Sequence, residues 1–287
     1  MIISASRRTD IPAYHAPWLM ERLREGFAMV ANPMNPRQVR RVDLRPEAVD
    51  GIVFWSKNPA PLLAYEKALR PYRCAWQFTL NAYAADVEPG APSEAARLET
   101  LKRLADAFGP ERVEWRYDPI LISAAYPAER HLASFERLAR AIAPYARGCT
   151  ISFVDFYRCA LRGLRACGAR DIALEERQAL AQQLQAIADA CRLPLRACCE
   201  EGLPLTQAHC VNAADFGLPA KADKNQRPGC GCAPSVDIGT YGTCPAGCAY
   251  CYARGHRAAP ACQKSLFDKR VDGGVNSPAT ATPTSFR

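Results

Sequence analysis

The sequence has no long apolar run. Nothing in its 287 residues approaches the roughly 18–20 apolar residues of a membrane helix. The opening stretch, MIISASRRTD, is too short in its apolar part and too soon charged for a secretory signal. These absences predict a cytoplasmic protein without a membrane partner. The chain also lacks a detectable internal repeat and a single long basic run, which speaks against a repeat architecture and gives only weak support for nucleic-acid binding.

The composition is ordinary for a soluble globular protein, with 49% hydrophobic and 23% charged residues. The length suits one large domain or two modest ones with a sizeable core. The formal charge of +8 favours nucleotide, phosphate or nucleic-acid partners, although such an excess is also common on solvated surfaces.

Cysteine is abundant, with 14 residues. Cytosolic thiols are kept reduced, so clustered cysteines predict metal binding or redox work more than disulfides. Five lie in apolar or helical stretches and are expected to be buried or inert: Cys74, Cys149, Cys159, Cys167 and Cys191. Seven lie within residues 198–251 at motif-like spacings: Cys198, Cys210, Cys230, Cys232, Cys244, Cys248 and Cys251.

Eight short apolar runs predict strands, and helical periodicity separates many of them. The predicted strands are 1–6, 27–32, 51–56, 74–80, 113–121, 149–155, 193–199 and 235–241. The predicted helices are 16–26, 61–70, 93–108, 128–146 and 173–191. This alternation predicts an α/β fold with a parallel sheet, and we expect a (β/α)8-like barrel in preference to an open doubly wound sheet.

Polar residues follow six of the predicted strands, where a barrel places its active site. For each of these polar residues taken alone, capping a helix or anchoring a loop is the alternative to a role in an active site. As a set they predict a pocket for a polar, anionic or zwitterionic small molecule. The candidate catalytic residues are Arg116, Asp118, Asp155 and Lys57, and the candidate cofactor-binding residues are Arg7, Arg8, Asp10, Asn81 and Glu200.

The stretch TCPAGCAYCYA, residues 243–253, gathers three thiols at a Cys-x3-Cys-x2-Cys spacing. Gly247 permits the tight turn that three thiolates need to wrap one inorganic cluster, and Pro245 stiffens its start. Cysteine thiolates at such spacings hold iron–sulfur clusters, and three ligands leave one iron of a four-iron cluster open. A structural zinc site, the competing reading, usually needs four protein ligands.

This spacing, with Tyr250 before the third cysteine, resembles the cluster loop of radical S-adenosylmethionine enzymes. Over residues 1–255 the chain resembles the domain-of-unknown-function family 1848, in SASRRTDIPA, NPMNPRQV, VFWSKNP, QFTLN, WRYDPIL and KADKNQRPGCGCAPSVDIGTYGTCPAGCAYCYA. That family carries a C-terminal cysteine cluster similar to the N-terminal one of the radical enzymes. The resemblance implies an iron–sulfur protein, with S-adenosylmethionine as a candidate cofactor, and supplies no reaction.

A circularly permuted barrel would reconcile the two positions of the cluster loop, if the strand at 235–241 stands where the radical enzymes have their first strand. We therefore expect a barrel body over residues 1–200, a cysteine-rich metal-binding segment with the last strand over 201–262, and a tail without fixed structure over 263–287.

The other four clustered thiols, Cys198, Cys210, Cys230 and Cys232, predict a second metal site, with an iron–sulfur cluster favoured over zinc. Cys199 and Cys262 are alternative ligands, while His209 and His256 are expected on the solvated surface.

Three functions remain open from the sequence. The first is a radical S-adenosylmethionine-like enzyme whose cluster receives electrons from an electron donor. The second is a non-radical protein with structural, redox or sensing metals. It is favoured because the radical enzymes usually carry a Gly-Gly-Glu-like stretch that holds the cofactor's amino group, whereas this chain has a Gly-Gly pair only at 273–274, in the tail. The third is a nucleic-acid-directed repair or modification protein, suggested by two basic groups: Arg37, Arg40, Arg41 and Arg45, and Lys221, Lys224 and Arg227.

Overall fold

The computed structural model describes residues 1–219, 221–227 and 229–254. The strands are β1 (Ile2–Ala5), β2 (Phe27–Ala31), β3 (Val39–Asp43), β4 (Gly51–Ser56), β5 (Cys74–Thr79), β6 (Val113–Ile120), β7 (Gly148–Phe153), β8 (Leu195–Ala197), β9 (Thr206–Gln207) and β10 (Val236–Asp237). The α-helices are α1 (Ile11–Tyr14), α2 (Ala16–Glu25), α3 (Ala60–Leu63), α4 (Glu66–Leu69), α5 (Glu94–Phe108), α6 (Ala128–Ile142), α7 (Leu161–Ala166) and α8 (Leu174–Ala190). The predicted tail at 263–287, with Cys262 and His256 before it, lies outside the described residues.

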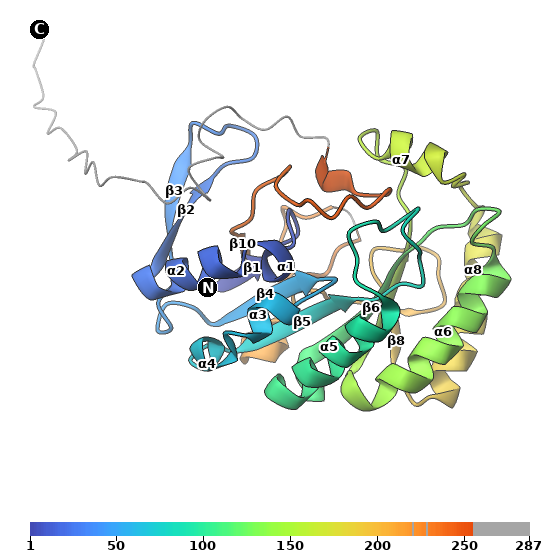
Figure 1. Ribbon diagram of the computed structural model, residues 1–287, viewed down its shortest axis with the longest axis horizontal. Coiled ribbons are helices and arrows are strands. Elements are labelled where there is room, and N and C mark those ends of the chain that lie inside the picture. The colour runs from blue at the N-terminus through green and yellow to red at the C-terminus, as the bar shows by residue number, and fades with distance from the viewer. Residues whose placement is uncertain (220, 228, 255–287) are drawn as a thin grey trace, which may run out of the picture.

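Eight strands form one parallel sheet in the order β10-β1-β4-β5-β6-β7-β8-β9. Helices α3 to α6 and α8 lie along this sheet in Figure 1. The predicted α/β class with a parallel sheet is therefore confirmed. No helix in the described ranges has both the length and the apolar character that crossing a membrane requires.

One predicted barrel strand lies outside this sheet. Residues 27–31 pair antiparallel with β3 and form a separate two-stranded hairpin, which projects from the body in Figure 1. The connection between the two strands is a short loop, and a parallel neighbour would need a crossover of about a dozen residues or more. The eighth strand of the large sheet is instead β9, a two-residue strand that the sequence pattern did not predict.

The closed barrel expected from the sequence is not shown. β10 and β9 are the two edges of the sheet, and no pairing among the described residues joins them. Part of the cysteine-rich segment, with Cys210, Phe216 and Cys232, packs with Val53 and Ala75 of the sheet in one buried cluster. This segment covers the sheet face that lies opposite the long helices.

Alternation along the strands divides the sheet into two different faces. On the helix side, Trp76 stacks on Phe54 and Trp115 stacks on Phe135, all of them fully buried. The opposite face carries buried polar residues on the central strands: Gln77, Glu114, Arg116, Thr150 and Ser152. An apolar layer cannot satisfy these groups, so they need polar partners from the segments that cover them.

The short strand β10 is held beside β1 by the carboxylate of Asp237. It accepts hydrogen bonds from the hydroxyls of Ser4 at 2.9 Å and Ser6 at 2.6 Å. It also accepts from the backbone N–H groups of Arg7 at 2.8 Å and Gly239 at 2.9 Å. The donors from Ser4, Ser6 and Arg7 thus join the C-terminal strand to the N-terminal segment, far apart in the sequence.

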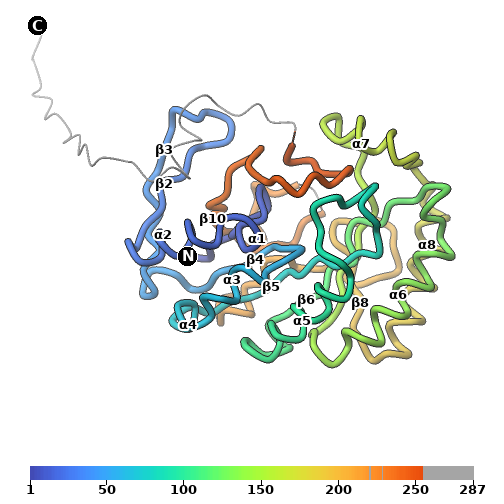
Figure 2. Tube along the Cα trace, viewed as in Figure 1, coloured from blue at the N-terminus to red at the C-terminus, as the bar shows by residue number. Residues whose placement is uncertain are grey.

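After β10 the chain crosses above the carboxyl edge of the sheet, from the hairpin side toward α7 (Figure 2). It is fixed by backbone hydrogen bonds from Gly90 N–H to the Ala246 carbonyl, 2.9 Å, and from Ala249 N–H to the Val87 carbonyl, 2.8 Å. Gly163 of α7 also touches this segment, because a Cβ built there would lie 2.1 Å from the Ala249 oxygen.

Replacing Gly163 with Ala is expected to loosen the segment that carries the last three cysteines. The added methyl group overlaps a backbone atom, at a cost of about 1–3 kcal/mol that exceeds the ~1 kcal/mol gain in helix propensity. Hydrogen exchange of the Ala249 amide should speed up by about tenfold or more. Ala166→Ser, at an exposed position of the same helix, serves as the control and should leave that amide unchanged. Unchanged exchange in Gly163→Ala would show that the contact does not hold the segment.

Candidate functional site

A cavity of about 490 Å³ opens at the carboxyl ends of β1, β4, β6 and β7. All seven cysteines predicted as metal ligands line it, together with Cys199. They come from the end of β8, from the segments before and after β9, and from the segment after β10. The tertiary structure thus brings eight thiols from separate parts of the chain to one space.

The first group of thiols, Cys244, Cys248 and Cys251, follows β10. Gly247 has a φ of +78°, in the left-handed region that favours glycine, and the Cys251 N–H donates to the Cys248 carbonyl at 3.2 Å. Burial raises the pKa of Cys248 to about 11 and also raises that of Cys244. Lys57 opposes the shift of Cys248 without cancelling it. In the absence of a metal ion these two thiols therefore stay protonated at neutral pH.

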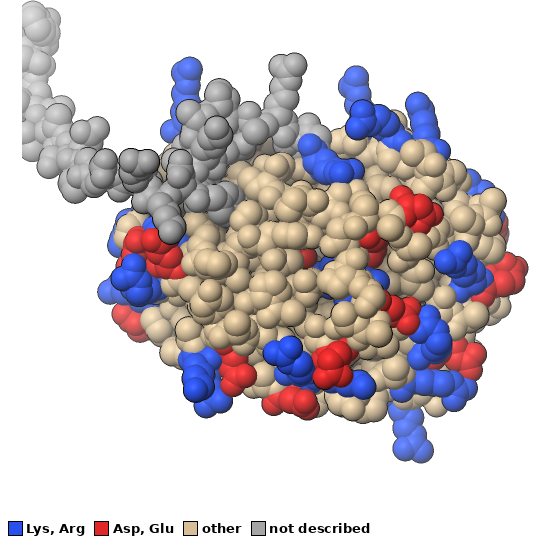
Figure 3. All heavy atoms as spheres, in the orientation of Figure 1, with Lys and Arg blue, Asp and Glu red and all other residues tan. Residues whose placement is uncertain are grey.

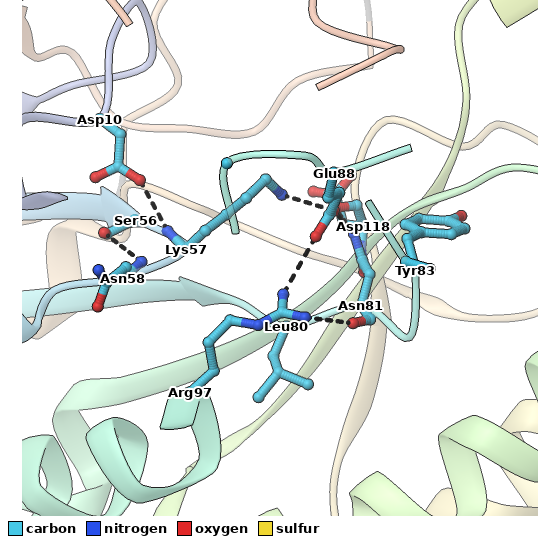
Figure 4. Close-up of polar contacts among 12 residues, drawn as sticks. Asp10, Ser56, Lys57, Asn58, Leu80, Asn81, Tyr83, Glu88, Arg97 and Asp118 are labelled. Atoms are coloured by element: carbon cyan, nitrogen blue, oxygen red, sulfur yellow. Dashed lines mark hydrogen bonds and ion pairs between the residues drawn. The ribbon is translucent and has the colours of Figure 1, made fainter. Parts of the chain in front are cut away.

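A buried ion network acts on Cys248 of this first group. Figure 4 shows its members Lys57, Glu88 and Arg97. The carboxylate of Glu88, fully buried, pairs with Lys57 Nζ at 3.1 Å and with Arg97 Nη1 at 3.2 Å. The Tyr250 hydroxyl donates to the same carboxylate, and Lys57 Nζ lies 5.3 Å from the centre of the Tyr250 ring. Burial favours neutral Lys57, but attraction to Glu88 outweighs it and raises the pKa, so the ammonium group stays charged at the cavity wall.

Asp10 lies on the same wall, at the start of α1. Its carboxylate accepts hydrogen bonds from the backbone N–H of Lys57 at 2.9 Å and of Ala13 at 3.0 Å (Figure 4). Burial raises the pKa of Asp10 to about 6. The carboxyl group therefore changes charge close to neutral pH, beside the thiol of Cys244.

The second group of thiols, Cys198, Cys199, Cys210, Cys230 and Cys232, is more tightly packed. The sulfur atoms of Cys198 and Cys210 are 3.4 Å apart, and the backbone N–H of Val211 points at the sulfur of Cys232 at 3.5 Å. Hydrogen bonds from Cys199 and Cys210 lower the pKa of Cys198. A hydrogen bond from Cys210 lowers that of Cys232 to about 5. This group therefore favours the thiolate form at two positions.

Arg116 connects this second group to the sheet. Its Nη1 donates to Cys210 Sγ at 2.8 Å and to Gln77 Oε1 at 3.2 Å, and the guanidinium group pairs with Asp118. The other oxygen of Asp118 accepts from the Ser152 hydroxyl at 2.5 Å. Burial opposes the charge of Arg116, but attraction to Asp118 and to the thiols raises its pKa well above the usual value.

Comparison with models of protein families shows which family the chain belongs to. The family model described as Domain of unknown function (DUF1848) matches residues 2–253. The chain belongs to this family. The predicted membership is confirmed, while the likeness to radical S-adenosylmethionine enzymes stays a prediction. No curated protein and no solved structure gives a significant match.

Most of the predicted polar residues of this DUF1848 chain line the thiol cavity. These are Arg7, Arg8, Asp10, Lys57, Arg116, Asp118 and Asp155. Asp155 lies at the rim, exposed and paired with Arg227 at 2.7 Å. Two predicted residues do not line it. Asn81 is buried behind the wall and donates to the Asp118 carbonyl at 2.9 Å. Glu200 accepts from the Phe153 N–H at 2.7 Å, and burial raises its pKa to about 7.

Sequence reasoning missed several residues of the site. Glu88 and Arg97 complete the charge network, and Trp55, Gln226 and Tyr252 line the cavity. Glu88 stands in a turn and Arg97 on a helix, and neither position breaks a pattern that would mark it. The exposed thiol of Cys159, expected to be buried or inert, donates to the Tyr252 carbonyl at 3.2 Å.

The metal-site prediction is not tested by this DUF1848 structure. Within residues 1–219, 221–227 and 229–254, no three or more His, Cys, Asp or Glu side chains form a group that could hold a metal ion. The thiols line one cavity. Contacts with other groups of the protein, such as that between Arg116 and Cys210, position their side chains. The assignment of Cys198, Cys210, Cys230, Cys232, Cys244, Cys248 and Cys251 as ligands therefore stays a prediction.

Replacing Glu88 with Gln should destabilise the protein in a pH-dependent way. Burial favours the neutral acid, but Lys57 and Arg97 outweigh burial and lower the pKa of Glu88 below its usual 4.5. Ionised Glu88 therefore stabilises the fold above that pH, and this contribution is lost as the pH falls through the lowered value. We expect a loss of about 3 kcal/mol in the free energy of unfolding at pH 7, because two buried cations lose their partner.

Urea unfolding of the wild type and Glu88→Gln between pH 7 and pH 3 measures this difference, which should shrink below about pH 4. Glu66→Gln is the matched control, since Glu66 forms an exposed pair with Arg70 and should cost at most about 0.5 kcal/mol. A loss at pH 7 as small as that of the control would contradict the assignment of a stabilising network.

Proposed function

We propose that the chain is an iron–sulfur protein and acts as a radical S-adenosylmethionine-like enzyme on a polar small molecule. The observation that carries the proposal is the convergence of both cysteine groups on one cavity whose walls also hold Lys57, Arg116 and three carboxylates, those of Asp10, Asp118 and Asp155. A merely structural metal needs no such space beside it. A cavity with fixed charges suits a substrate that must be bound and oriented.

In this proposal Cys244, Cys248 and Cys251 hold a four-iron cluster. Three thiols on a tight turn fit a cluster that keeps one iron open. Lys57 supports the fit, because a buried ammonium group beside Cys248 offsets the negative charge that thiolates bring. When bound, the cluster would supply one electron at its open iron, received from an external donor. S-adenosylmethionine is the cofactor that the family resemblance implies.

The order of the strands supports a permuted, (β/α)8-like arrangement as part of this proposal. β10 lies at the edge of the sheet beside β1 and parallel to it. The segment that follows β10 is thus the loop after the first strand in space, although it comes last in the sequence. That is the position at which the radical enzymes carry their cysteine loop.

The chain's own charged groups would bind and orient the reactants. Arg7, Arg8 and Asp10 lie at the end of β1 and are assigned to the cofactor's charged groups. Lys57, Arg116, Asp118 and Asp155 are assigned to the substrate. Asp10 is suited to exchange a proton near pH 6, because burial has brought its pKa there. Asn81 and Glu200 would act through the residues that they hold in place.

A single zinc ion is a second candidate for Cys198, Cys210, Cys230 and Cys232. A specific distance favours it: the 3.4 Å between the sulfur atoms of Cys198 and Cys210 is close to the roughly 3.8 Å edge of a thiolate tetrahedron around zinc, which follows from Zn–S bonds of about 2.3 Å. The Arg116 and Val211 N–H groups that point at sulfur would support either metal. Metal analysis separates the two.

The enzymatic proposal is tested by anaerobic reconstitution with iron and sulfide. Reduction in the presence of S-adenosylmethionine should yield 5′-deoxyadenosine, and adding the cofactor should change the spectrum of the cluster. Protein with a well-formed four-iron cluster that gives neither result would refute the radical reading. Protein purified without oxygen that holds only zinc, without iron or acid-labile sulfide, would leave a structural role.

The two cysteine groups should be separable by mutation. Cys248→Ser should remove one metal site and leave the fold intact, because its segment lies on top of the sheet. Cys232→Ser should lower the thermal midpoint more, since Cys232 is buried under the sheet with Cys210 and metal binding there contributes to folding. Metal content and midpoint are measured for both, with exposed Cys159→Ser as the control. Equal losses of iron and of stability in both variants would indicate one shared cluster.

A further inference from the structure

A second cavity of about 680 Å³ lies between the β2–β3 hairpin and the segments around residues 225 and 235–241. Three arginines line it, Arg7, Arg8 and Arg40, and the only carboxylate in its described lining is that of Asp237. The formal charge of its lining is therefore 3 − 1 = +2. Its volume is within the range of sites for small molecules, about 300–1,000 Å³.

The carboxylate contributes little toward an incoming ligand. Asp237 already accepts hydrogen bonds from Ser4, Ser6 and two backbone N–H groups. Its distance to Arg8 Nε is 3.9 Å, longer than a hydrogen bond. The negative charge of Asp237 is thus directed into the β1–β10 junction, while the arginine charges border the cavity.

Two of the arginines have donors to spare. The Nη2 of Arg7 is buried and has no hydrogen-bond partner among the described residues, whereas its Nη1 donates to Gln226 at 3.1 Å. The Arg40 side chain, exposed on β3, has no ion pair or hydrogen bond within the described part of the chain. Arg7 borders both cavities, and its guanidinium carbon lies 5.1 Å from the centre of the Trp55 ring on the side of the thiol cavity. A buried guanidinium donor without an acceptor is costly, so an anionic oxygen within reach of Nη2 would stabilise it.

We propose that this second cavity binds the phosphate group of a small molecule, free phosphate or a phosphate monoester. Guanidinium groups match phosphate oxygens in pairs, and several of them around one cavity suit a doubly charged group better than a single carboxylate. Amide side chains of Asn32, Gln38 and Asn225 border the cavity. Asn32 already donates to the Gln38 oxygen at 2.9 Å and Asn225 to Asp223 at 3.2 Å. The remaining amide N–H groups offer neutral hydrogen bonds to the rest of the ligand.

The second cavity shares a wall with the thiol cavity. Arg7, Arg8, Gln226 and Tyr252 line both. A phosphate ester held beside the hairpin would thus direct its remaining part toward the thiols. This placement of a phosphorylated substrate rests on the proposed function, whereas the phosphate site itself does not.

A polynucleotide is the less favoured ligand. On the face shown in Figure 3, basic side chains are interspersed with acidic ones and do not form one continuous stripe. Arg41, next to Arg40, lies over the ring of Phe27 at 4.2 Å and does not line the cavity. The free arginine donors are gathered around a space of limited volume, which suits one phosphate group.

The neighbouring arginines provide a matched pair of variants. Side chains alternate across a strand, so Arg40 and Arg41 point to opposite faces of the hairpin. Arg40→Gln and Arg41→Gln remove the same charge from adjacent positions of one exposed strand. Only Arg40→Gln removes a group that lines the cavity. The comparison therefore separates a specific contact from the general effect of net charge.

The experiment is calorimetric titration of the anaerobically purified full chain with ribose 5-phosphate, inorganic phosphate, a single-stranded oligonucleotide and, as the neutral control, ribose. We expect a phosphate compound to bind and ribose not to bind. The Kd of the phosphate compound that binds should rise by about tenfold or more in Arg40→Gln and by less than about twofold in Arg41→Gln. The tighter of the two phosphate compounds identifies the source of the group.

Three results would overturn the inference: no binding of either phosphate compound up to millimolar concentration, equal weakening in both variants, or binding of a single-stranded oligonucleotide alone. The heat of binding requires no reaction, and iron and zinc are measured on the same sample. Phosphate binding by a chain that carries only zinc would thus uphold this inference while the proposed enzymatic function fails.

Discussion

The buried guanidinium group of Arg116 is the constraint on which the centre of the structure depends. It stands on the polar face of the sheet and would be costly to bury without partners. Asp118, Gln77 and Cys210 supply them. Because Cys210 belongs to the segment that covers this face, the arginine joins the sheet, the cysteine-rich segment and the cavity. An apolar layer could not cover this polar face. This explains why a loop segment with polar groups lies where the interior of a closed barrel would be.

The two ends of the thiol cavity differ in their electrostatics. Around Cys248, burial dominates and keeps the thiol protonated, while the charge of Lys57 is held by Glu88. Neighbouring thiols lower the pKa of both Cys198 and Cys232, and Arg116 adds to this effect at Cys198 while Arg7 adds to it at Cys232. One cavity thus presents Cys244 and Cys248 as thiols that a metal would have to deprotonate, and Cys198 and Cys232 as thiols that favour the thiolate form. The two metal sites that we propose would therefore bind their metals in different electrostatic surroundings.

The wall between the two cavities gives the N-terminal segment a double role. Arg7 and Arg8 follow β1 directly, beside Asp237 of β10. Their backbone and side chains therefore connect the junction of the two ends of the chain with both cavities. One short stretch of chain thus borders the thiol cavity, the second cavity and the β1–β10 junction.

The sequence by itself determined the α/β class, most strands and helices, the family and the grouping of the cysteines. Alternation, helical periodicity and spacing are local properties, and Cys244, Cys248 and Cys251 are close in the sequence. Only the tertiary structure decided that residues 27–31 form a hairpin, that the sheet has two edges, and that Glu88 and Arg97 stabilise the wall. Each feature depends on which other segment supplies the partner, such as β3 for residues 27–31, and Lys57 and Arg97 for Glu88. Local patterns carry no information on that choice, because burial and ion pairing are settled by packing across the whole chain.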